Sequence, residues 1–230
     1  MKIGIIILSR YSSSRFPGKA LYKINGNTLL GSIVDSFKLK SPQIECVVAT
    51  SVETSDNPIV EFCKNKGYKF YRGSLNNVSE RVLSCSIYKN WDYFVRINGD
   101  NLFNNPIILK EMLNDIDIKK YDFISNVEGR TFPHGMSIEI VKVSFYEKIY
   151  KKFYNINHKE HVTSWLYENP LYGNRFYFYN DRYKNIEGIK LSIDDKKDID
   201  RAKKIIEFNN GKSIVSLNVL NQYFKKNHIS

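Results

Sequence analysis

The sequence predicts an α/β fold built as one domain around a mixed, mostly parallel sheet. Three observations predict it. Short apolar runs alternate with helix-like patterns over the first 130 residues, the rhythm changes after residue 130, and no Pro/Ser-rich linker or repeat divides the chain. Strands that alternate with helices of this length are typical of parallel sheets with right-handed crossovers. A chain of 230 residues is long enough to bury the core of such a domain.

The first half of the chain supplies five expected strands, each an apolar run bounded by turn residues. These runs cover residues 3–8, 45–50, 68–73, 92–97 and 121–126. Helices are predicted between them at about 29–39, 57–67, 77–89 and 106–117. Pro58 and Pro106 stand where first-turn prolines belong, which supports two of these helices.

The second half is predicted to be partly antiparallel and to form a wall over the edge of the sheet. The expected elements are a strand at 136–142, a helix at 143–153, a polar helix from about 158, an aromatic-rich strand at 174–180, a short strand at 188–193 and two C-terminal helices. The last of these, within 213–227, has apolar residues at helical spacing. It is expected to dock against the domain, and a dimer contact is the alternative.

Composition and charge exclude several classes of protein. No stretch of 18 or more apolar residues exists, so no membrane helix is expected. The three cysteines have no CxxC spacing, which is typical of reduced core residues in a cytoplasmic protein. The net charge of +11 comes from lysines spread as doublets rather than gathered in one stripe. A solvated basic surface is therefore favoured over a nucleic-acid partner.

The loop after the first strand carries unusual charge. Residues 9–21 read SRYSSSRFPGKAL, with three cations (Arg10, Arg15, Lys19), the hydroxyls of Ser12 to Ser14, and a Pro17-Gly18 turn. Backbone N–H groups in glycine-containing turns and cationic side chains are what binds polyphosphate. The loop matches neither GxxxxGK[ST] nor GxGxxG, so the P-loop and dinucleotide fingerprints are absent. The sequence predicts a polyphosphate site of another kind.

Two aspartates follow later strands of the expected sheet. Asp100 ends the fourth strand within Asn98-Gly99-Asp100-Asn101, and Asp194 follows the expected strand at 188–193. Ligands of open α/β sheets bind outside the carboxyl ends of the strands, where these aspartates would face the cationic loop. Two carboxylates suit a Mg²⁺ that shares its coordination with phosphate oxygens. Asp195 and Asp198 are expected to cap the next helix.

At this point the chain resembles the sugar cytidylyltransferases that make CMP-activated 3-deoxy-octulosonate and acylneuraminate, together with the related spore-coat-polysaccharide-type enzymes. The resemblance runs in consistent order through about residues 2–208. The matching segments are the R-x-x-S-x-R-x-P-G-K loop at 10–19, Asp56-Asn57-Pro58 with Tyr71-Arg72-Gly73, Glu80-Arg81, V-R-I-x-G-D at 95–100, Arg130-Thr131-Phe132-Pro133-His134-Gly135 with Glu139, E-H-V-T at 160–163, and Asp194 with Asp198.

The resemblance implies a Rossmann-like nucleotidyltransferase fold of three layers and a role for each matching residue. The implied reaction is the Mg²⁺-dependent transfer of CMP from CTP to an acidic sugar, with release of pyrophosphate. The resemblance also implies a role in surface polysaccharide biosynthesis and a homodimer. Residues 1–130 would form the nucleotide half, 131–208 the acceptor and dimerisation half, and 209–230 a C-terminal helix. The implied catalytic residues are Arg15, Lys19 and Asp100; the metal ligands are Asp100 and Asp194; the nucleotide contacts are Ser9, Arg10, Ser12, Ser13, Ser14, Arg15, Lys19, Ser79, Arg81 and Asp100; and the acceptor contacts are Arg72, Arg96, Arg130, His134, Glu139, Glu160, His161 and Thr163.

The sequence leaves alternatives open. The acceptor could be a phosphorylated polyol or a phosphonate, which needs only cations, whereas a sugar hydroxyl needs a base such as Glu139 or Glu160. His134 departs from the family pattern, and Arg96 could instead form a buried ion pair. CTP is selected over UTP by the resemblance alone. A glycosyltransferase would need a D-x-D motif that is missing at 100–102, and an RNA-binding module finds support only in FYFYNDRYK at 176–184.

Overall fold

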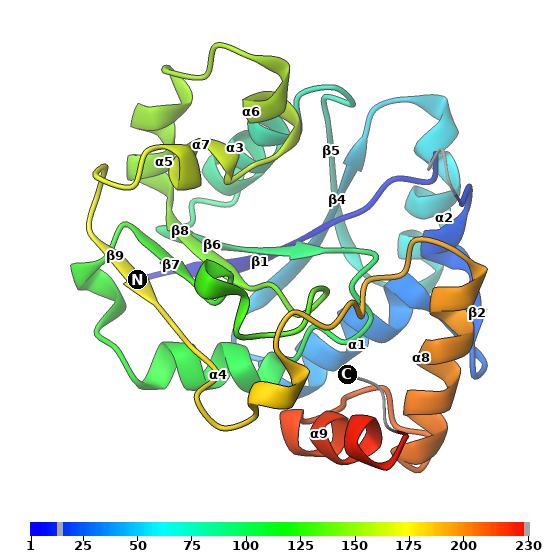
Figure 1. Ribbon diagram of the computed structural model, residues 1–230. Helices are drawn as coiled ribbons and strands as arrows, with labels where there is room; N and C mark the ends of the chain where they lie inside the picture. Colours follow the sequence, from blue (N-terminus) through cyan, green and yellow to red (C-terminus); the bar gives the residue numbers. More distant parts are fainter. Residues whose placement is uncertain (13–15, 228–230) are drawn as a thin grey trace.

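The computed structural model describes residues 1–12 and 16–227 of the chain. Its centre is a seven-stranded sheet with the order β5-β4-β1-β6-β8-β7-β9 (Figure 1). In chain order these strands are β1 (Ile3–Leu8), β4 (Glu45–Ser51), β5 (Lys69–Gly73), β6 (Tyr93–Asn98), β7 (Phe123–Ser125), β8 (Glu139–Lys142) and β9 (Arg175–Tyr177).

The sheet is mostly parallel, as the sequence predicts. Strands β5, β4, β1 and β6 all run in one direction, and β8 is antiparallel to its neighbours β6 and β7. At the end of β1, Leu8 pairs with Ala49 of β4 on one side and with Asn98 of β6 on the other. The carboxyl ends of the three central strands therefore meet at one edge of the sheet, where open α/β folds bind ligands.

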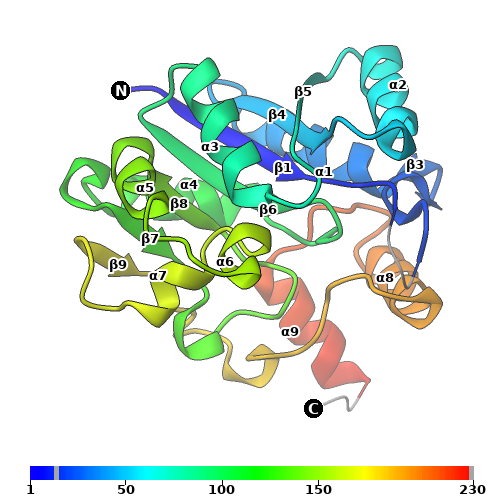
Figure 2. The ribbon, with the colours of Figure 1, turned by 90° about the horizontal axis from the view of Figure 1, so that it is seen from above.

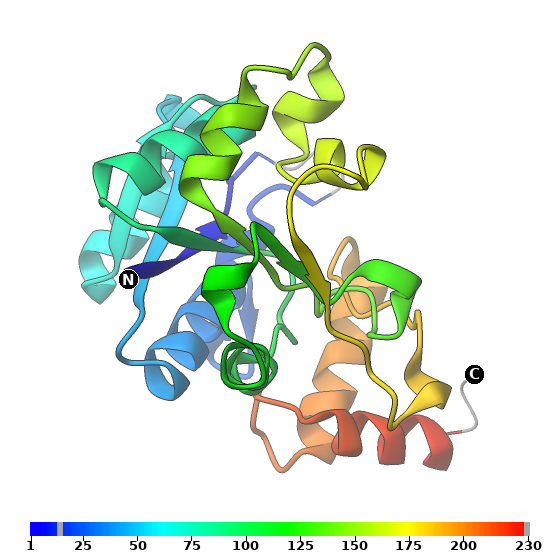
Figure 3. The ribbon, with the colours of Figure 1, turned by 90° about the vertical axis from the view of Figure 1, so that its left-hand side faces the viewer.

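Helices cover both faces of the sheet and make three layers. They are α1 (Leu29–Lys40), α2 (Asn57–Lys66), α3 (Val78–Tyr88), α4 (Pro106–Asn114), α5 (Val143–Tyr150), α6 (Ile156–Glu160), α7 (Ser164–Glu168), α8 (Lys196–Phe208) and α9 (Leu217–Lys226). Figure 3 shows α5 to α7 (yellow-green) on one face and α8 and α9 (orange and red) on the other. Figure 2 shows α2 beside β5 at one edge of the sheet and β9 at the other.

The alternation of side chains along β1 divides the core between these faces. Ile5 and Ile7 belong to the core under α1, α4, α8 and α9, whereas Ile6 belongs to the core under α3 and α5. A strand buried on both faces needs such a continuous apolar run. Helix α9 adds Leu220 and Phe224, both buried, to the first core, so the predicted docking of the C-terminal helix is confirmed.

A short hairpin that the sequence analysis did not predict precedes α1. Its strands β2 (Lys23–Ile24) and β3 (Asn27–Thr28) are joined by Asn25-Gly26, both with positive φ. Asn-Gly is the usual choice for a two-residue turn of this kind, because both central residues need left-handed backbone angles. Thr28 then caps α1 by accepting a hydrogen bond from the Gly31 N–H.

Two predicted elements are wrong. The helix expected from about 158 consists of two short helices, because His161 adopts extended backbone angles between α6 and α7. The strand expected at 188–193 does not form; only a bridge joins Lys190 to His134. No helix in the described part of the chain has the length and hydropathy needed to cross a membrane.

Candidate active site

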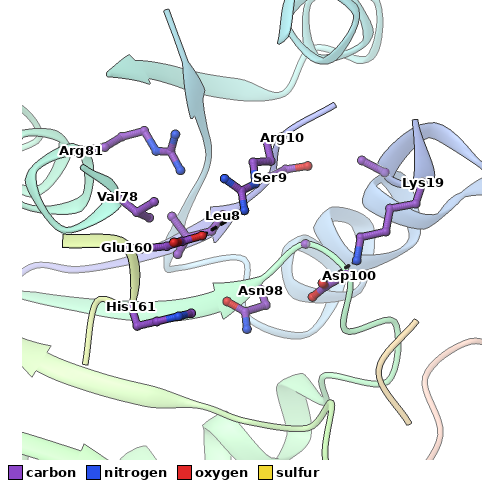
Figure 4. Close-up of a pocket in the computed structure, with 12 residues that line it drawn as sticks. Leu8, Ser9, Arg10, Lys19, Val78, Arg81, Asn98, Asp100, Glu160 and His161 are labelled. Atoms are coloured by element: carbon purple, nitrogen blue, oxygen red, sulfur yellow. Dashed lines mark hydrogen bonds and ion pairs between the residues drawn. The ribbon is translucent and has the colours of Figure 1, made fainter. Parts of the chain in front are cut away.

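A cavity of about 390 Å³ lies at the carboxyl ends of β1 and β6 (Figure 4). The first βα loop, the end of β6, the first turns of α3 and the C-terminus of α6 surround it. Its lining residues are Leu8, Ser9, Arg10, Lys19, Ala20, Val78, Arg81, Asn98, Gly99, Asp100, Glu160 and His161. Seven of the residues that the sequence predicted for nucleotide or acceptor binding thus meet here, although Arg10 and Glu160, for example, are 150 positions apart along the chain.

Gly99 brings the end of β6 against the end of β1. Its N–H donates to the Leu8 carbonyl at 2.7 Å, and a Cβ at this position would lie 2.6 Å from that same oxygen. Any larger residue would push the two strand ends apart. The Gly-Asp pair therefore places the Asp100 carboxylate directly beside the first loop.

Lys19 joins that loop to two carboxylates. Its ammonium lies 2.8 Å from Oδ2 of Asp100 and 3.8 Å from Oδ1 of Asp194, and it donates to the Ile193 carbonyl at 3.0 Å. The Lys19 and Asp194 side chains are largely buried and that of Asp100 is about one-third exposed. The predicted meeting of the loop with both aspartates is therefore seen in the structure, although no strand precedes Asp194.

The donor set at this point fits Mg²⁺. Asp100 and Asp194 both direct a carboxylate oxygen toward the Lys19 ammonium. Mg²⁺ is usually held by one or two carboxylates together with substrate phosphates. Within residues 1–12 and 16–227, no group of three or more His, Cys, Asp or Glu side chains forms a complete metal cage. A metal at this position would need further oxygens from a ligand such as a triphosphate.

Arg10 and Glu160 face each other across the cavity. The Arg10 guanidinium donates to Oε1 of Glu160 at 3.2 Å, and both side chains are close to half exposed. This pair links the first loop to α6, and Figure 4 shows it between Arg81 and Asp100. An exposed pair of this kind contributes little stability, so the Arg10 cation remains available to an anionic ligand.

Arg81 supplies a buried cation from α3. Only 2% of its surface is exposed, one of its terminal nitrogens donates to the Ser74 carbonyl at 3.1 Å, and its Nε has no hydrogen-bond partner among the described residues. Burial lowers the pKa of Arg81 to about 10, against the attraction of the Asp56 carboxylate. Gly73 makes room for it, since a Cβ there would lie 2.8 Å from the Arg81 Cγ.

Asn98 lines the cavity, although the sequence did not predict it as a binding residue. Asn98 Oδ1 accepts a hydrogen bond from Arg96 at 2.7 Å, which turns the amide N–H₂ away from Arg96. His161 also lines the cavity (Figure 4). The available signal was the alternation R-I-N at the end of β6, since residues two apart share a face of a strand.

Arg96 and Glu139, predicted for the acceptor, pair with each other beneath the cavity. Arg96 Nε donates to Glu139 Oε2 at 2.5 Å, Tyr167 donates to Glu139 Oε1 at 2.8 Å, and Glu139 is 1% exposed. Burial alone would lower the pKa of Arg96, but the Glu139 carboxylate outweighs it and raises that pKa. The buried ion pair left open by the sequence is therefore the one present, and neither side chain lines the cavity.

Three further predicted residues also lie outside the cavity lining. The hydroxyl of Ser79 is buried and donates to the His158 carbonyl at 2.6 Å. Arg72 donates to the carbonyls of Ser51 and Glu53, both at 2.9 Å. Thr163 is buried just before α7. The Ser79 and Arg72 side chains thus bind neighbouring backbone, and none of the three residues lines the cavity.

Arg130 and His134 lie together on another segment. Arg130 is exposed and has a positive φ of 52°, while His134 is partly buried and exchanges backbone hydrogen bonds with Ile189 and Leu191. Burial, assisted by the Arg130 charge, lowers the pKa of His134. This segment lines neither the cavity nor the Lys19 cluster, but the chain it pairs with leads directly to Asp194.

The middle of the first loop is outside the described residues. Arg15, Ser13 and Ser14, which the sequence predicts for phosphate binding, lie in this part, and Ser12 at its boundary is exposed. Their assignment stays a prediction. The described ends of the loop supply Ser9 and Arg10 on one side and Lys19 on the other.

Comparison with known proteins identifies the family. The sequence pattern of the cytidylyltransferases matches residues 4–227. The spore coat polysaccharide biosynthesis protein SpsF of Bacillus subtilis is 27% identical over 213 residues, which is 88% of this chain and 85% of that protein.

Two solved structures share the fold. A cytidylyltransferase from Leptospira borgpetersenii superposes with a TM-score of 0.91 at 30% identity, covering 99% of this chain and 95% of that one. A CMP:2-keto-3-deoxy-manno-octonic acid synthetase complexed with CTP superposes at 0.69 with 14% identity, over 91% and 100% of the two chains. The predicted three-layer nucleotidyltransferase fold is thereby confirmed. The chain therefore belongs to the cytidylyltransferase family and is a nucleotidyltransferase that uses CTP.

Proposed function

We propose that the chain transfers CMP from CTP to an acidic 3-deoxy or nonulosonic sugar, with Mg²⁺, and releases pyrophosphate. The observation that carries the proposal is the cluster of Lys19, Asp100 and Asp194 at the edge of a cavity that also presents Arg10 and Arg81. Lys19 and Arg10 match the phosphates of a nucleoside triphosphate, and the two carboxylates match the metal that accompanies it.

The cations would act mainly by position and charge. Lys19 and Arg10 would hold the phosphates so that the α-phosphorus faces the acceptor and the bond to the leaving pyrophosphate lies in line with the attacking oxygen. Mg²⁺ held by Asp100 and Asp194 would supply neutralisation of the charge that develops on the phosphates. Preorganised charge of this type is the largest usual contribution to such reactions.

The opposite end of the cavity is the proposed place of the base. There Val78 offers an apolar surface, and the buried Arg81 offers its Nε, which has no hydrogen-bond partner within residues 1–12 and 16–227. An unpaired buried donor is costly, so a ligand acceptor at this position would be favoured. Cytosine presents such acceptors at its O2 and N3 positions.

A sugar hydroxyl must lose its proton as it attacks. Glu139 is used in its buried pair with Arg96, so the described cavity residues proposed to take up this proton are Glu160 and His161. A phosphate or phosphonate acceptor is already ionised and needs no base. The two acceptor classes therefore predict different consequences for Glu160→Gln: a loss of turnover for a hydroxyl and little change for a phosphate.

The experiment measures pyrophosphate release from CTP and Mg²⁺ with a panel of acceptors: 3-deoxy-octulosonate, a nonulosonic acid, phosphorylated polyols and a phosphonate. Asp100→Asn, which keeps the size of the side chain, is the control. Release with an acidic sugar, abolished in Asp100→Asn, would support the proposal. Release with a phosphorylated acceptor alone would move the assignment to that class, and no release with any acceptor would count against it.

The biological setting is part of the same proposal. The related SpsF protein is named for spore coat polysaccharide biosynthesis, which supports a role in surface polysaccharide biosynthesis. We further propose a cytoplasmic homodimer without a nucleic-acid or membrane partner. Sedimentation equilibrium tests the dimer, and a monomer at micromolar concentration would contradict it.

A further inference from the structure

We propose that Asp56 is a positioning residue for this reaction: its buried carboxylate fixes the base of the first loop, whose two ends carry Arg10 and Lys19. The inference rests on the proposed function, because the loop positions a triphosphate only if the cavity binds one. Asp56 lies between β4 and α2, outside the cavity lining.

The Asp56 carboxylate is completely buried and binds two backbone N–H groups. Oδ1 accepts from the Tyr11 N–H at 2.7 Å, and Oδ2 accepts from the Ser51 N–H at 3.0 Å. Although Asp56 directly precedes α2, its side chain makes no capping bond to that helix. The carboxylate thus reaches across 45 positions of sequence to the first loop, in place of the local role that its position predicts.

Tyr11 joins the two ends of the first loop at its base. While its N–H donates to Asp56, its carbonyl accepts from the Gly18 N–H at 2.9 Å. Gly18 has a positive φ of 72°, and a Cβ there would lie 3.2 Å from the Tyr11 ring, so the two residues are packed together. Residues 11 and 18 are therefore tied at the base of the loop, whatever the segment between them does.

Lys19 follows Gly18 directly. Its ammonium reaches Asp100, so a continuous path of covalent and hydrogen bonds runs from Asp56 through Tyr11, Gly18 and Lys19 to Asp100. Arg10 precedes Tyr11 and starts from the same fixed point. One buried carboxylate thereby sets the origin of both cations that flank the phosphate end of the cavity.

The charge of Asp56 suits this role. Burial alone would raise the pKa of Asp56, but hydrogen bonds from Ser51 and from the Tyr11 backbone outweigh it and lower that pKa. A carboxylate that stays ionised binds backbone N–H groups more strongly than a neutral side chain does. Its charge also attracts the buried Arg81 guanidinium and raises the pKa of that group against the larger effect of burial.

A purely structural role makes a different prediction. If Asp56 only held the β4–α2 turn, its loss would lower stability and leave the affinity for nucleotide unchanged in the folded protein. If Asp56 positions the first loop, its loss weakens the binding of CTP much more than the binding of CMP. The reason is that CMP lacks the two phosphates that the loop ends would contact. The ratio of these two affinities separates the roles.

The test compares Asp56→Asn and Asp56→Ala with the wild type by calorimetric titration of CTP and CMP. The control is Glu45→Gln, at the opposite end of β4, where the carboxylate binds Lys69, Lys89 and the Trp91 indole. We expect Asp56→Ala to weaken CTP about tenfold or more, as for loss of a charge-assisted hydrogen bond, and CMP less than about threefold. Asp56→Asn, which keeps one acceptor oxygen, should fall between, and Glu45→Gln should change neither affinity.

Equal losses of CTP and CMP affinity, or none in a folded Asp56→Ala variant, would overturn the inference. If that variant does not fold, amide hydrogen exchange in the wild type decides. The Tyr11 N–H should exchange as slowly as the amides of β1 do at neutral pH. Exchange at the rate of an open loop would contradict the proposed fixing of the loop by Asp56. A wild type that binds neither nucleotide would count against the proposed function, while the exchange result would still stand by itself.

Discussion

Lys19 bridges Asp100 and Asp194, two carboxylates that lie 81 and 175 positions away in the sequence. The ammonium therefore occupies the space between the two oxygens that are proposed to hold Mg²⁺. In the free protein it neutralises their mutual repulsion, and it must leave at least one of them when a metal is bound. This relationship connects the first loop with the proposed metal site.

Replacing Lys19 by Met should separate its two effects. Loss of one positioned cation is expected to lower kcat about 100-fold or more. Binding of Mn²⁺ to the nucleotide-free protein should instead become tighter, because no ammonium competes for the carboxylates. Electron paramagnetic resonance of added Mn²⁺ measures the second effect. Lys19→Arg is the control, and unchanged Mn²⁺ affinity in Lys19→Met would contradict the bridging role.

Glu139→Gln should act on stability rather than on the acceptor. It would leave the Arg96 guanidinium in the sheet without its anionic partner, which costs about 3 kcal/mol. Urea denaturation measures the loss, and the KM for the acceptor should stay within about twofold. A normal stability with a much raised KM would return Glu139 to the acceptor site. The double variant Arg96→Met, Glu139→Met should recover part of the loss, because no charge is then left unpaired.

Asp198 should make the protein sensitive to acid. Its nearly buried carboxylate accepts from the Asp194 and Asp195 N–H groups and pairs with Lys190, and these contacts, stronger than the opposing effect of burial, lower its pKa. The stabilisation is complete above the unfolded-state pKa of about 4 and is lost as pH falls toward the lower folded-state pKa.

The free energy of unfolding between pH 3 and 7 tests this contribution. Asp198→Asn should flatten the decline below pH 4, whereas Asp200→Asn, an exposed neighbour on α8, should leave the curve unchanged. An Asp198→Asn variant with the wild-type pH dependence would show that the carboxylate is not held in its charged form.

His134 should be neutral at pH 7. Its pKa is lowered, so between that value and about 6.5 the unfolded chain binds a proton that the folded protein does not. The unfolding free energy should therefore rise with pH across this window. An NMR titration of His134 measures the pKa directly. Arg130→Met should move it upward by removing the neighbouring positive charge, and an unchanged value would contradict that cause.

The parallel half of the fold was predictable because its signals are local. The apolar run IGIIIL and the runs at 45–50 and 92–97 are long enough to be buried strands, and each is followed by a periodic helix. The segment at 188–193 misled for a physical reason. Leu191 and Ile193 do alternate with more exposed residues, but their N–H groups donate to His134 and Asp100 on separate loops. Alternation records burial and does not identify the hydrogen-bond partner.

The candidate site, like the fold, was predictable only in part. Lys19 and Asp100 come after the strands β1 and β6, so their meeting at one edge could be inferred from topology. Asp194 was expected there by way of a strand at 188–193 that does not form. Whether Arg96 or Asn98 faced the ligand could not be inferred, because both lie on the same face of β6 and only the position of Glu139 on β8 decides which one is used internally. The role of Asp56 depends on a contact across 45 positions that leaves no pattern in the sequence.

Thermal stability of the purified protein with CTP, UTP, ATP and GTP, each with and without Mg²⁺, tests directly whether the cavity is a cytidine triphosphate site. A ligand at a hundredfold excess over its Kd stabilises the folded state by about 2.7 kcal/mol, which is easily measured. The account predicts a Mg²⁺-dependent increase in Tm with CTP that exceeds the increase with UTP and the purine nucleotides. Equal shifts with all four nucleotides, or none with CTP, would contradict a cytidine triphosphate site at Lys19, Asp100 and Arg81.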